Sequence, residues 1–284
     1  MTLWRRMEER IITFLMVLST ILISAGLVFI IVIIIAKGFP AMNIAMVTQV
    51  PEGGFYLGKG GGVLNAIVGS LLVAGGATIL AMIVSIPIVL YLNLLRRKGS
   101  KLVRVTRFCF DILWGVPSIV YGAFGFTLML LLGIKASLLG GIIAVFFLEL
   151  PVMSRAVDEV VRMVPVELEE AAASMGATRL EISFKVILRQ IVSPLVTAIL
   201  IAFGRGVGDA AAVIFTAGYS DHIPASLGQP AATLPLAIFF QLGTPFPAVQ
   251  QRAYASAFIL TVIILMISIV SRIIANRFSR HTIK

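Results

Sequence analysis

Cysteine, histidine and charged residues are all scarce in this chain. It has one cysteine, Cys109, and two histidines, His222 and His281, among 284 residues. A single cysteine cannot form an internal disulfide, and the two histidines lie too far apart in sequence to suggest a zinc cluster. Only 13% of the residues are charged, whereas about 25% are charged in an ordinary soluble domain. The composition therefore excludes a disulfide-stapled secreted module and argues against a soluble globular protein.

Apolar residues are abundant instead. They make up 59% of the chain, and the mean hydropathy is +1.05. A helix that crosses a bilayer needs about 20 mostly apolar residues. Runs of this kind predict an all-helical integral membrane protein with six transmembrane helices, at residues 11–36, 64–94, 108–132, 137–160, 190–217 and 252–274. The first run is longer than the apolar core of a signal peptide, so we expect an uncleaved helix there.

The basic residues indicate how the chain is oriented in the membrane. When the loops between the six helices alternate sides, 18 of the 23 Lys and Arg residues fall on one side, four fall on the other, and Arg205 lies inside a span. Basic residues prefer the cytoplasmic side, so both termini are predicted to be cytoplasmic. No basic patch is interleaved with aromatic residues, and we expect no nucleic-acid partner.

Two long outer stretches are rich in glycine and proline. Residues 37–62 are predicted to form a loop, and residues 218–250 to contain a short helix or a re-entrant segment. Residues 53–59 spell G-x-x-x-x-G-K, but glycine follows in place of Ser or Thr and no strand precedes them, so we reject a nucleotide-binding loop. Each stretch is either a plain connection or a docking surface for an extracytoplasmic partner.

The most strongly charged segment lies between the fourth and fifth predicted helices. Pro165 can open a helix, and Glu167, Glu169 and Glu170 then lie in the first turns, where the helix dipole favours acidic residues. Gly176 fits the end of this helix. A second helix is predicted from residue 178 toward the membrane. The segment therefore predicts a short, exposed cytoplasmic helix that a partner could approach closely.

This segment carries a resemblance to a known family. Glu170-Ala171-Ala172, three further residues and Gly176 resemble the E-A-A-x-x-x-G loop of ABC importer permeases, whose short helix sits in a groove of the ATPase subunit. The resemblance implies that Glu167, Glu170, Ala171, Ala172 and Gly176 couple this chain to a cytoplasmic ATPase. The alternative is an amphipathic helix that lies on the inner leaflet.

Further residues narrow the resemblance and also depart from it. The family continues after the glycine with I-x-L-P, whereas residues 186–189 read VILR here. Residues 115–122, GVPSIVYG, are similar to a segment typical of phosphate-importer permeases, and Leu150-Pro151 with Arg155 and Glu159 fits their fourth helix. The similarity covers about residues 65–275.

The resemblance implies a type I ABC importer permease of MetI-like architecture, in the cytoplasmic membrane of a prokaryote. Such a chain provides half of a path for inorganic phosphate and is not itself an enzyme. It binds no cofactor, because ATP is held by partner subunits. The implied partners are a homologous permease, two copies of a cytoplasmic ATPase and an extracytoplasmic phosphate-binding protein. The expected organisation is a cytoplasmic N-terminus at 1–10, a first helix and outer loop at 11–62, a permease domain at 63–275 with its coupling loop at 161–189, and a cytoplasmic C-terminus at 276–284.

Charged residues inside the predicted spans are the candidates for a substrate path. Arg205 and Asp209 are four residues apart on the predicted fifth helix, so their side chains can reach each other. A charge at the bilayer centre costs about 2.5–3.5 kcal/mol. The pair therefore forms either a structural salt bridge on a close-packed face, with Gly204 and Gly208 in a G-x-x-x-G spacing, or part of a substrate path. A guanidinium suits a tetrahedral oxyanion.

Comparison with the family supports the substrate path only in part. The matching stretch of phosphate permeases reads R-A-x-G-E-T, so Arg205 and Gly208 match, whereas Asp209 stands in place of Glu and Ala210 in place of Thr. The predicted path consists of Arg205, Gly208, Asp209 and Glu149. Glu149 interrupts the fourth apolar run and is either a second polar element of the path or a carboxylate at the membrane boundary.

Other functions stay open at this point. A permease of the same architecture could carry another oxyanion, such as molybdate, sulfate or phosphonate. A stand-alone channel or ion-driven carrier would also contain intramembrane charges, but it would not need the cytoplasmic loop, and we find no clear inverted repeat. A purely structural membrane anchor would leave Arg205 and Asp209 unexplained.

Overall fold

The computed structural model describes residues 3–53, 60–95 and 100–278. Most of the G-x-x-x-x-G-K segment, at 54–59, and the end of the predicted cytoplasmic C-terminus, at 279–284, lie outside the described residues. In chain order the elements are α1 (Leu3–Gly38), η1 (Phe39–Ala41), α2 (Ile44–Thr48), β1 (Pro51–Glu52), β2 (Gly60–Gly61), α3 (Leu64–Leu90), η2 (Tyr91–Leu95), α4 (Lys101–Trp114), α5 (Ser118–Leu131), α6 (Leu138–Arg162), α7 (Val166–Ser174), α8 (Arg179–Glu181), η3 (Ile182–Ile187), α9 (Leu188–Gln190), α10 (Val192–Gly208), α11 (Leu234–Leu242) and α12 (Pro247–Phe278).

The all-helical membrane architecture predicted from the sequence is confirmed. Within the described residues, four helical stretches are long and apolar enough to cross a bilayer: Met7–Ala41, Leu64–Leu94, Leu138–Arg162 and Pro247–Ala275. Two bent pairs of helices pass the same test only when each pair is taken together. The predicted count of six is therefore reached if each bent pair is one span.

The predicted third helix, 108–132, is wrong as a continuous helix. The chain forms α4 and α5 instead, and their axes meet at 103°. Pro117 lacks a backbone N–H and disfavours the helical conformation at Val116, so the helix cannot run on through this segment. Gly115 closes α4, with its N–H bonded to the carbonyl of Ile112 at 3.0 Å.

The predicted fifth helix, 190–217, is also wrong at its C-terminal end. α10 ends at Gly208, and Asp209 is extended, with φ −83° and ψ 121°. The Asp209 Oδ1 atom accepts a hydrogen bond from the N–H of Ala212 at 2.7 Å. A side chain that bonds to the nearby backbone in this way competes with helix continuation, and three glycines before it weaken the helix.

The remaining helices follow the prediction more closely. α6 continues through Glu149 and Pro151 to Arg162, and α11 is the short helix expected within 218–250. Residues 37–62 hold more regular structure than expected. They form η1, α2 and a small antiparallel pair in which Pro51 lies opposite Gly61 and Glu52 opposite Gly60.

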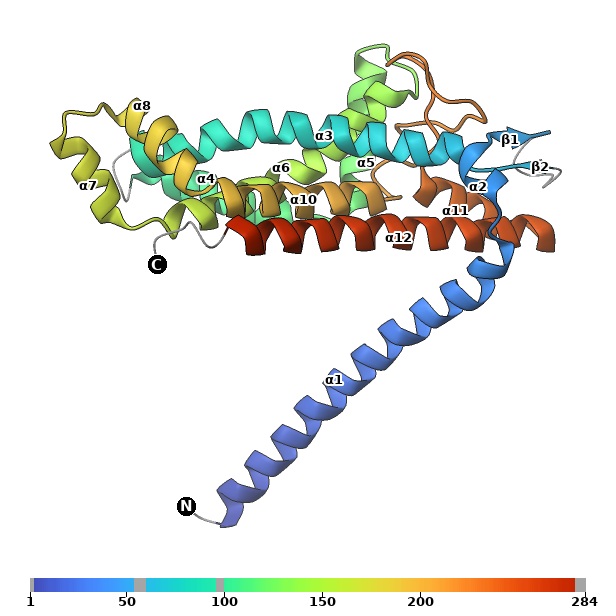
Figure 1. The fold of residues 1–284 in the computed structure, drawn as a ribbon, viewed down its shortest axis with the longest axis horizontal. Helices are drawn as coiled ribbons and strands as arrows, with labels where there is room; N and C mark the ends of the chain where they lie inside the picture. Colours follow the sequence, from blue (N-terminus) through green and yellow to red (C-terminus); the bar gives the residue numbers. More distant parts are fainter. Residues whose placement is uncertain (1–2, 54–59, 96–99, 279–284) are drawn as a thin grey trace.

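The helices pack into an elongated bundle. α3, α10 and α12 run along its long axis, and α1 leaves it at an angle (Figure 1). The most extensive helix contact joins α3 and α6, where Ala77 packs with Ile142 and Val145. Small residues allow the two helix backbones to approach closely. α7 and α8 lie at one end of the bundle, and β1, β2 and α2 lie at the opposite end (Figure 1).

Candidate functional site

The short exposed helix predicted after residue 165 is present as α7. Pro165 precedes it, Glu167 and Glu169 lie in its first turn, and none of its residues is fully buried. The helix ends at Ser174, and Gly176 follows with a φ of +83°, the left-handed conformation that glycine adopts without strain. Ala172 packs against the buried core, whereas Glu170 and Ala171 face outward. The helix therefore presents acidic and small residues on an open face.

The segment after Gly176 begins as predicted and then differs. Thr178 caps α8 in a reciprocal arrangement: its hydroxyl accepts from the Glu181 N–H, and the Glu181 carboxylate accepts from the Thr178 N–H at 3.0 Å. The next turn, Ile182–Ile187, is π-helical rather than α-helical. α9 and α10 follow, with a 75° bend between the segment Arg179–Gln190 and α10.

Arg205 and Asp209 do not form a salt bridge, which was one of the two alternatives for this pair. Asp209 lies beyond the end of α10, and its carboxylate bonds to the backbone of Ala212. The Arg205 side chain is exposed, and across the part of the chain that the structure describes it makes no ion pair or hydrogen bond. The guanidinium of Arg205 thus has no counter-charge among the described residues.

The three glycines around Arg205 lie on two different faces of α10. A Cβ atom on Gly204 or Gly208 would lie 3.8 Å from Ile267 or 3.6 Å from Ile264, both on α12. A Cβ atom on Gly206 would lie 2.0 Å from the Glu149 carboxylate on α6. The G-x-x-x-G spacing therefore packs α10 against α12, and Gly206 allows α10 to approach α6.

Glu149 is fully buried between three helices. Its Oε2 atom accepts a hydrogen bond from the Thr78 hydroxyl of α3 at 2.8 Å, and its Oε1 atom, which faces Gly206, has no partner among the described residues. Glu149 therefore lies beside Gly206, the residue that follows Arg205. The structure does not bring the two side chains together, because Arg205 is exposed and Glu149 has no exposed surface.

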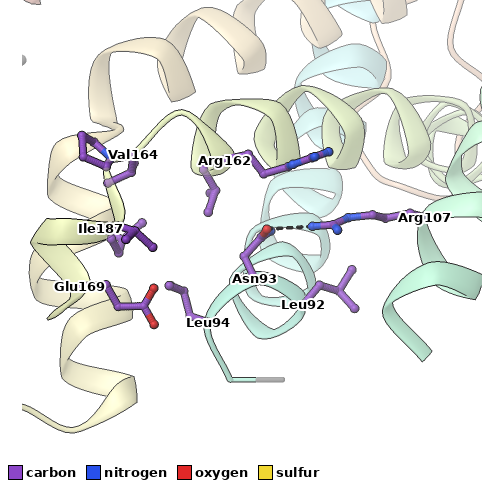
Figure 2. Close-up of a pocket in the computed structure, with 11 residues that line it drawn as sticks. Leu92, Asn93, Leu94, Arg107, Arg162, Val164, Glu169 and Ile187 are labelled. Atoms are coloured by element: carbon purple, nitrogen blue, oxygen red, sulfur yellow. Dashed lines mark hydrogen bonds between the residues drawn. The ribbon is translucent and has the colours of Figure 1, made fainter. Parts of the chain in front are cut away.

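Sequence reasoning missed a polar cluster that lies across a cavity from α7. Asn93, Arg107 and Asp158 come from η2, α4 and α6 and are joined by hydrogen bonds. Figure 2 shows Asn93 and Arg107 beside a cavity of about 510 Å³ that extends to Glu169 of α7. The signal in the sequence is weak, because Asp158 is one of several charged residues in the last turns of α6, beside Glu159 and between Arg155 and Arg162.

These features define the class of the protein: a multi-pass, all-helical membrane component with a short exposed helix, α7, at one end. Residues 84–284 match the model of the family described as "Binding-protein-dependent transport system inner membrane component". The chain belongs to this family. It is therefore a membrane component of a transport system.

Named relatives cover nearly the whole chain. The phosphate transport system permease protein PstA of Yersinia pestis is 32% identical over 271 residues, which are 95% of this chain and 91% of the relative. The phosphate transport system permease protein PstA 1 of Mycobacterium tuberculosis strain H37Rv is 31% identical over an alignment that covers 99% of this chain and 92% of the relative.

Solved structures share the fold. A bacterial alginate ABC transporter chain matches with a TM-score of 0.66 and 14% identity, over 99% of both chains. A chain of the MetNI methionine ABC transporter matches with a TM-score of 0.62 and 20% identity, over 78% of this chain and 96% of that chain. The fold is that of type I ABC importer permeases.

Proposed function

We propose that this chain is the permease subunit of an ATP-driven importer of inorganic phosphate and provides half of the path across the membrane. The observation that carries the proposal is the similarity to phosphate permeases, which extends over 95% of this chain at 32% identity. A similarity of this extent includes the docking helix α7, the end of α10 and both bent helix pairs. Those are the parts that a permease of this kind would use.

Arg205 is the residue that we expect to contact phosphate. Its exposed guanidinium lacks a counter-charge in the described part of the chain, and the fork of donors suits two oxygens of a tetrahedral anion. Asp209 does not compete for this guanidinium, since its carboxylate bonds to the Ala212 N–H. Gly208 and Glu149 shape the surroundings of Arg205 by setting how closely α10 packs against α12 and α6.

We infer the partners from the family and assign them to the two ends of the bundle. α7 would dock in a cytoplasmic ATPase through Glu167, Glu170, Ala171, Ala172 and Gly176. Two copies of that ATPase would bind and hydrolyse ATP, a homologous permease would complete the path, and this chain would hold no cofactor. The opposite end, with β1, β2 and α2, would face an extracytoplasmic phosphate-binding protein. Both termini would then be cytoplasmic.

Uptake of labelled phosphate tests the proposal. Cells that carry the complete transporter, with or without this chain, are given labelled phosphate in competition with sulfate, molybdate or a phosphonate. Loss of phosphate-selective uptake when the chain is omitted is the expected result. Stronger competition by another oxyanion would change the substrate and leave the architecture intact. Uptake that persists without the ATPase subunit would instead support a channel or carrier.

A further inference from the structure

Asn93, Arg107 and Asp158 form a closed ring of hydrogen bonds. Asp158, 1% exposed, accepts from Arg107 Nε at 3.0 Å through Oδ2 and from Arg107 Nη2 at 3.0 Å through Oδ1. Asn93 Nδ2 donates to the same Oδ1 atom at 2.7 Å, and Arg107 Nη2 donates to Asn93 Oδ1 at 2.8 Å. Each of the three side chains is thus bonded to the other two, and each comes from a different element.

Stability alone does not explain this ring. A buried ion pair contributes little compared with apolar side chains of the same volume, because both charges must be taken out of water. Its bidentate geometry does fix how the two groups are oriented. The ring therefore holds η2, α4 and α6 in one relative arrangement, which generic apolar packing would not specify.

The coupling loop is tied to the same short element. The carbonyl of Leu94, the residue after Asn93, accepts a hydrogen bond from Arg179 Nη1 at 2.8 Å, and the same nitrogen lies 3.9 Å from the Glu169 carboxylate of α7. The Leu94 side chain is buried with Ile182 and Ile187 of η3. Consecutive residues of η2 thus contact the coupling loop and the ring. Figure 2 shows this arrangement, with Glu169 and Ile187 near Leu94, and Asn93 facing Arg107.

We propose that Asn93, Arg107 and Asp158 are positioning residues that form a rigid joint, through which a displacement of α7 is passed to α4. α4 continues into α5 at the 103° bend, so a movement of α4 would also displace α5 within the bundle. η2 is a π-helical turn, a form that frequently marks functional sites in helices. This inference rests on the proposed function, because it requires an ATPase that moves α7.

The substitution Asn93→Leu tests the joint without leaving a buried charge unpaired. It removes the link from η2 to the ring and keeps the ion pair of Arg107 and Asp158. In the complete transporter reconstituted in vesicles, we expect phosphate transported per ATP hydrolysed to fall about fivefold or more, the scale of a typical coupling between sites, while ATP hydrolysis continues. An unchanged ratio, or a proportional loss of both activities, would overturn the inference.

The chain offers a matched control. Arg155 Nε lies 3.0 Å from the exposed Asp111 carboxylate, so this pair joins the same helices, α6 and α4, but lies outside the ring. The variant Asp111→Asn should keep the transport ratio of the parent protein. A fall in the ratio as large as that of Asn93→Leu would mean that loss of any polar contact in this region lowers the ratio, and the joint would be rejected.

A second measurement does not depend on the substrate, and its result for the parent protein does not depend on how well the variant folds. Spin labels are placed at Val105 of α4 and Leu180 of α8, both exposed, in a chain whose exposed Cys109 is replaced by serine. In the parent transporter the distance between the labels should be the same with and without ATP. In Asn93→Leu the distance with ATP should differ from the distance without ATP. A parent distance that changes with ATP would overturn the joint. Absence of phosphate transport by the parent would defeat the proposed function alone.

Discussion

Alanine in place of Gly206 adds a methyl group at the closest approach of α10 to α6. The new Cβ atom would lie 2.0 Å from Glu149 Oε1 and 3.1 Å from Val145 Cγ1. Non-bonded heavy atoms attract best at about 3.5–4.0 Å, so both contacts are repulsive. Glu149 cannot turn away easily, because it is fully buried and its other oxygen is bonded to Thr78. α10 must therefore move away from α6.

The size of the effect follows from two opposing terms. Overpacking a core costs about 1–3 kcal/mol. Alanine gains about 1 kcal/mol over glycine in a helix. Gly204→Ala on the same helix gains the same propensity, but its Cβ atom would lie at an ordinary 3.8 Å from Ile267. The difference in free energy of unfolding between the two variants therefore isolates the overpacking term, about 1–3 kcal/mol.

Unfolding of the purified chain in mixed detergent micelles measures this difference. We expect Gly204→Ala to be at least as stable as the parent and Gly206→Ala to be less stable than Gly204→Ala. Adding Glu149→Ala to Gly206→Ala should remove most of the penalty, because the closer of the two clashing groups is gone. Equal stability of the two glycine variants would refute the close contact between α10 and α6.

Three further predictions concern transport. Arg205→Ala should abolish phosphate uptake while normal amounts of protein reach the membrane, because folding loses no ion pair with it; normal uptake by the inserted variant would contradict this. Gly176→Trp should block assembly with the ATPase, or coupling to it, but not insertion, since the positive φ of this residue disfavours a side chain and the indole would stand beside the docking face; co-purification with an active ATPase would count against it. Glu149→Gln should reduce uptake if this carboxyl belongs to the path, and unaltered uptake would remove it from the path.

The sequence was sufficient for features that depend on composition and local pattern. Long apolar runs require lipid as the solvent, so the membrane-spanning helices could be located from hydropathy. α7 could also be predicted, because Pro165, the acidic first turn and Gly176 are local signals for the start and end of a helix. Breaks inside apolar stretches were harder, since residues 115–117 interrupt a helix with little change in hydropathy, and the charge of Asp209 does not by itself predict that the helix ends there.

The candidate site was less predictable, because it depends on contacts between distant residues. Spacing alone could pair Arg205 with Asp209, but the helix ends at Gly208 and Asp209 bonds to its own turn. The ring of Asn93, Arg107 and Asp158 joins residues 51 and 65 positions apart, and no periodicity relates them. Glu149 could be found as an isolated carboxylate in an apolar stretch, but the sequence does not show that Thr78 and Gly206 surround it.

The bend between α4 and α5, which starts at Gly115 and Pro117, is held by two hydrogen bonds to one backbone oxygen. A break in a helix frees backbone polar groups, and apolar surroundings require that such groups find partners within the protein. The carbonyl oxygen of Leu113 accepts from the Val116 N–H at 3.1 Å and from the Tyr121 hydroxyl at 2.6 Å, so the two helices are fastened at a single acceptor. Hydropathy counts Tyr121 as one more aromatic ring, whereas the direction that the chain takes here is secured by its hydroxyl group.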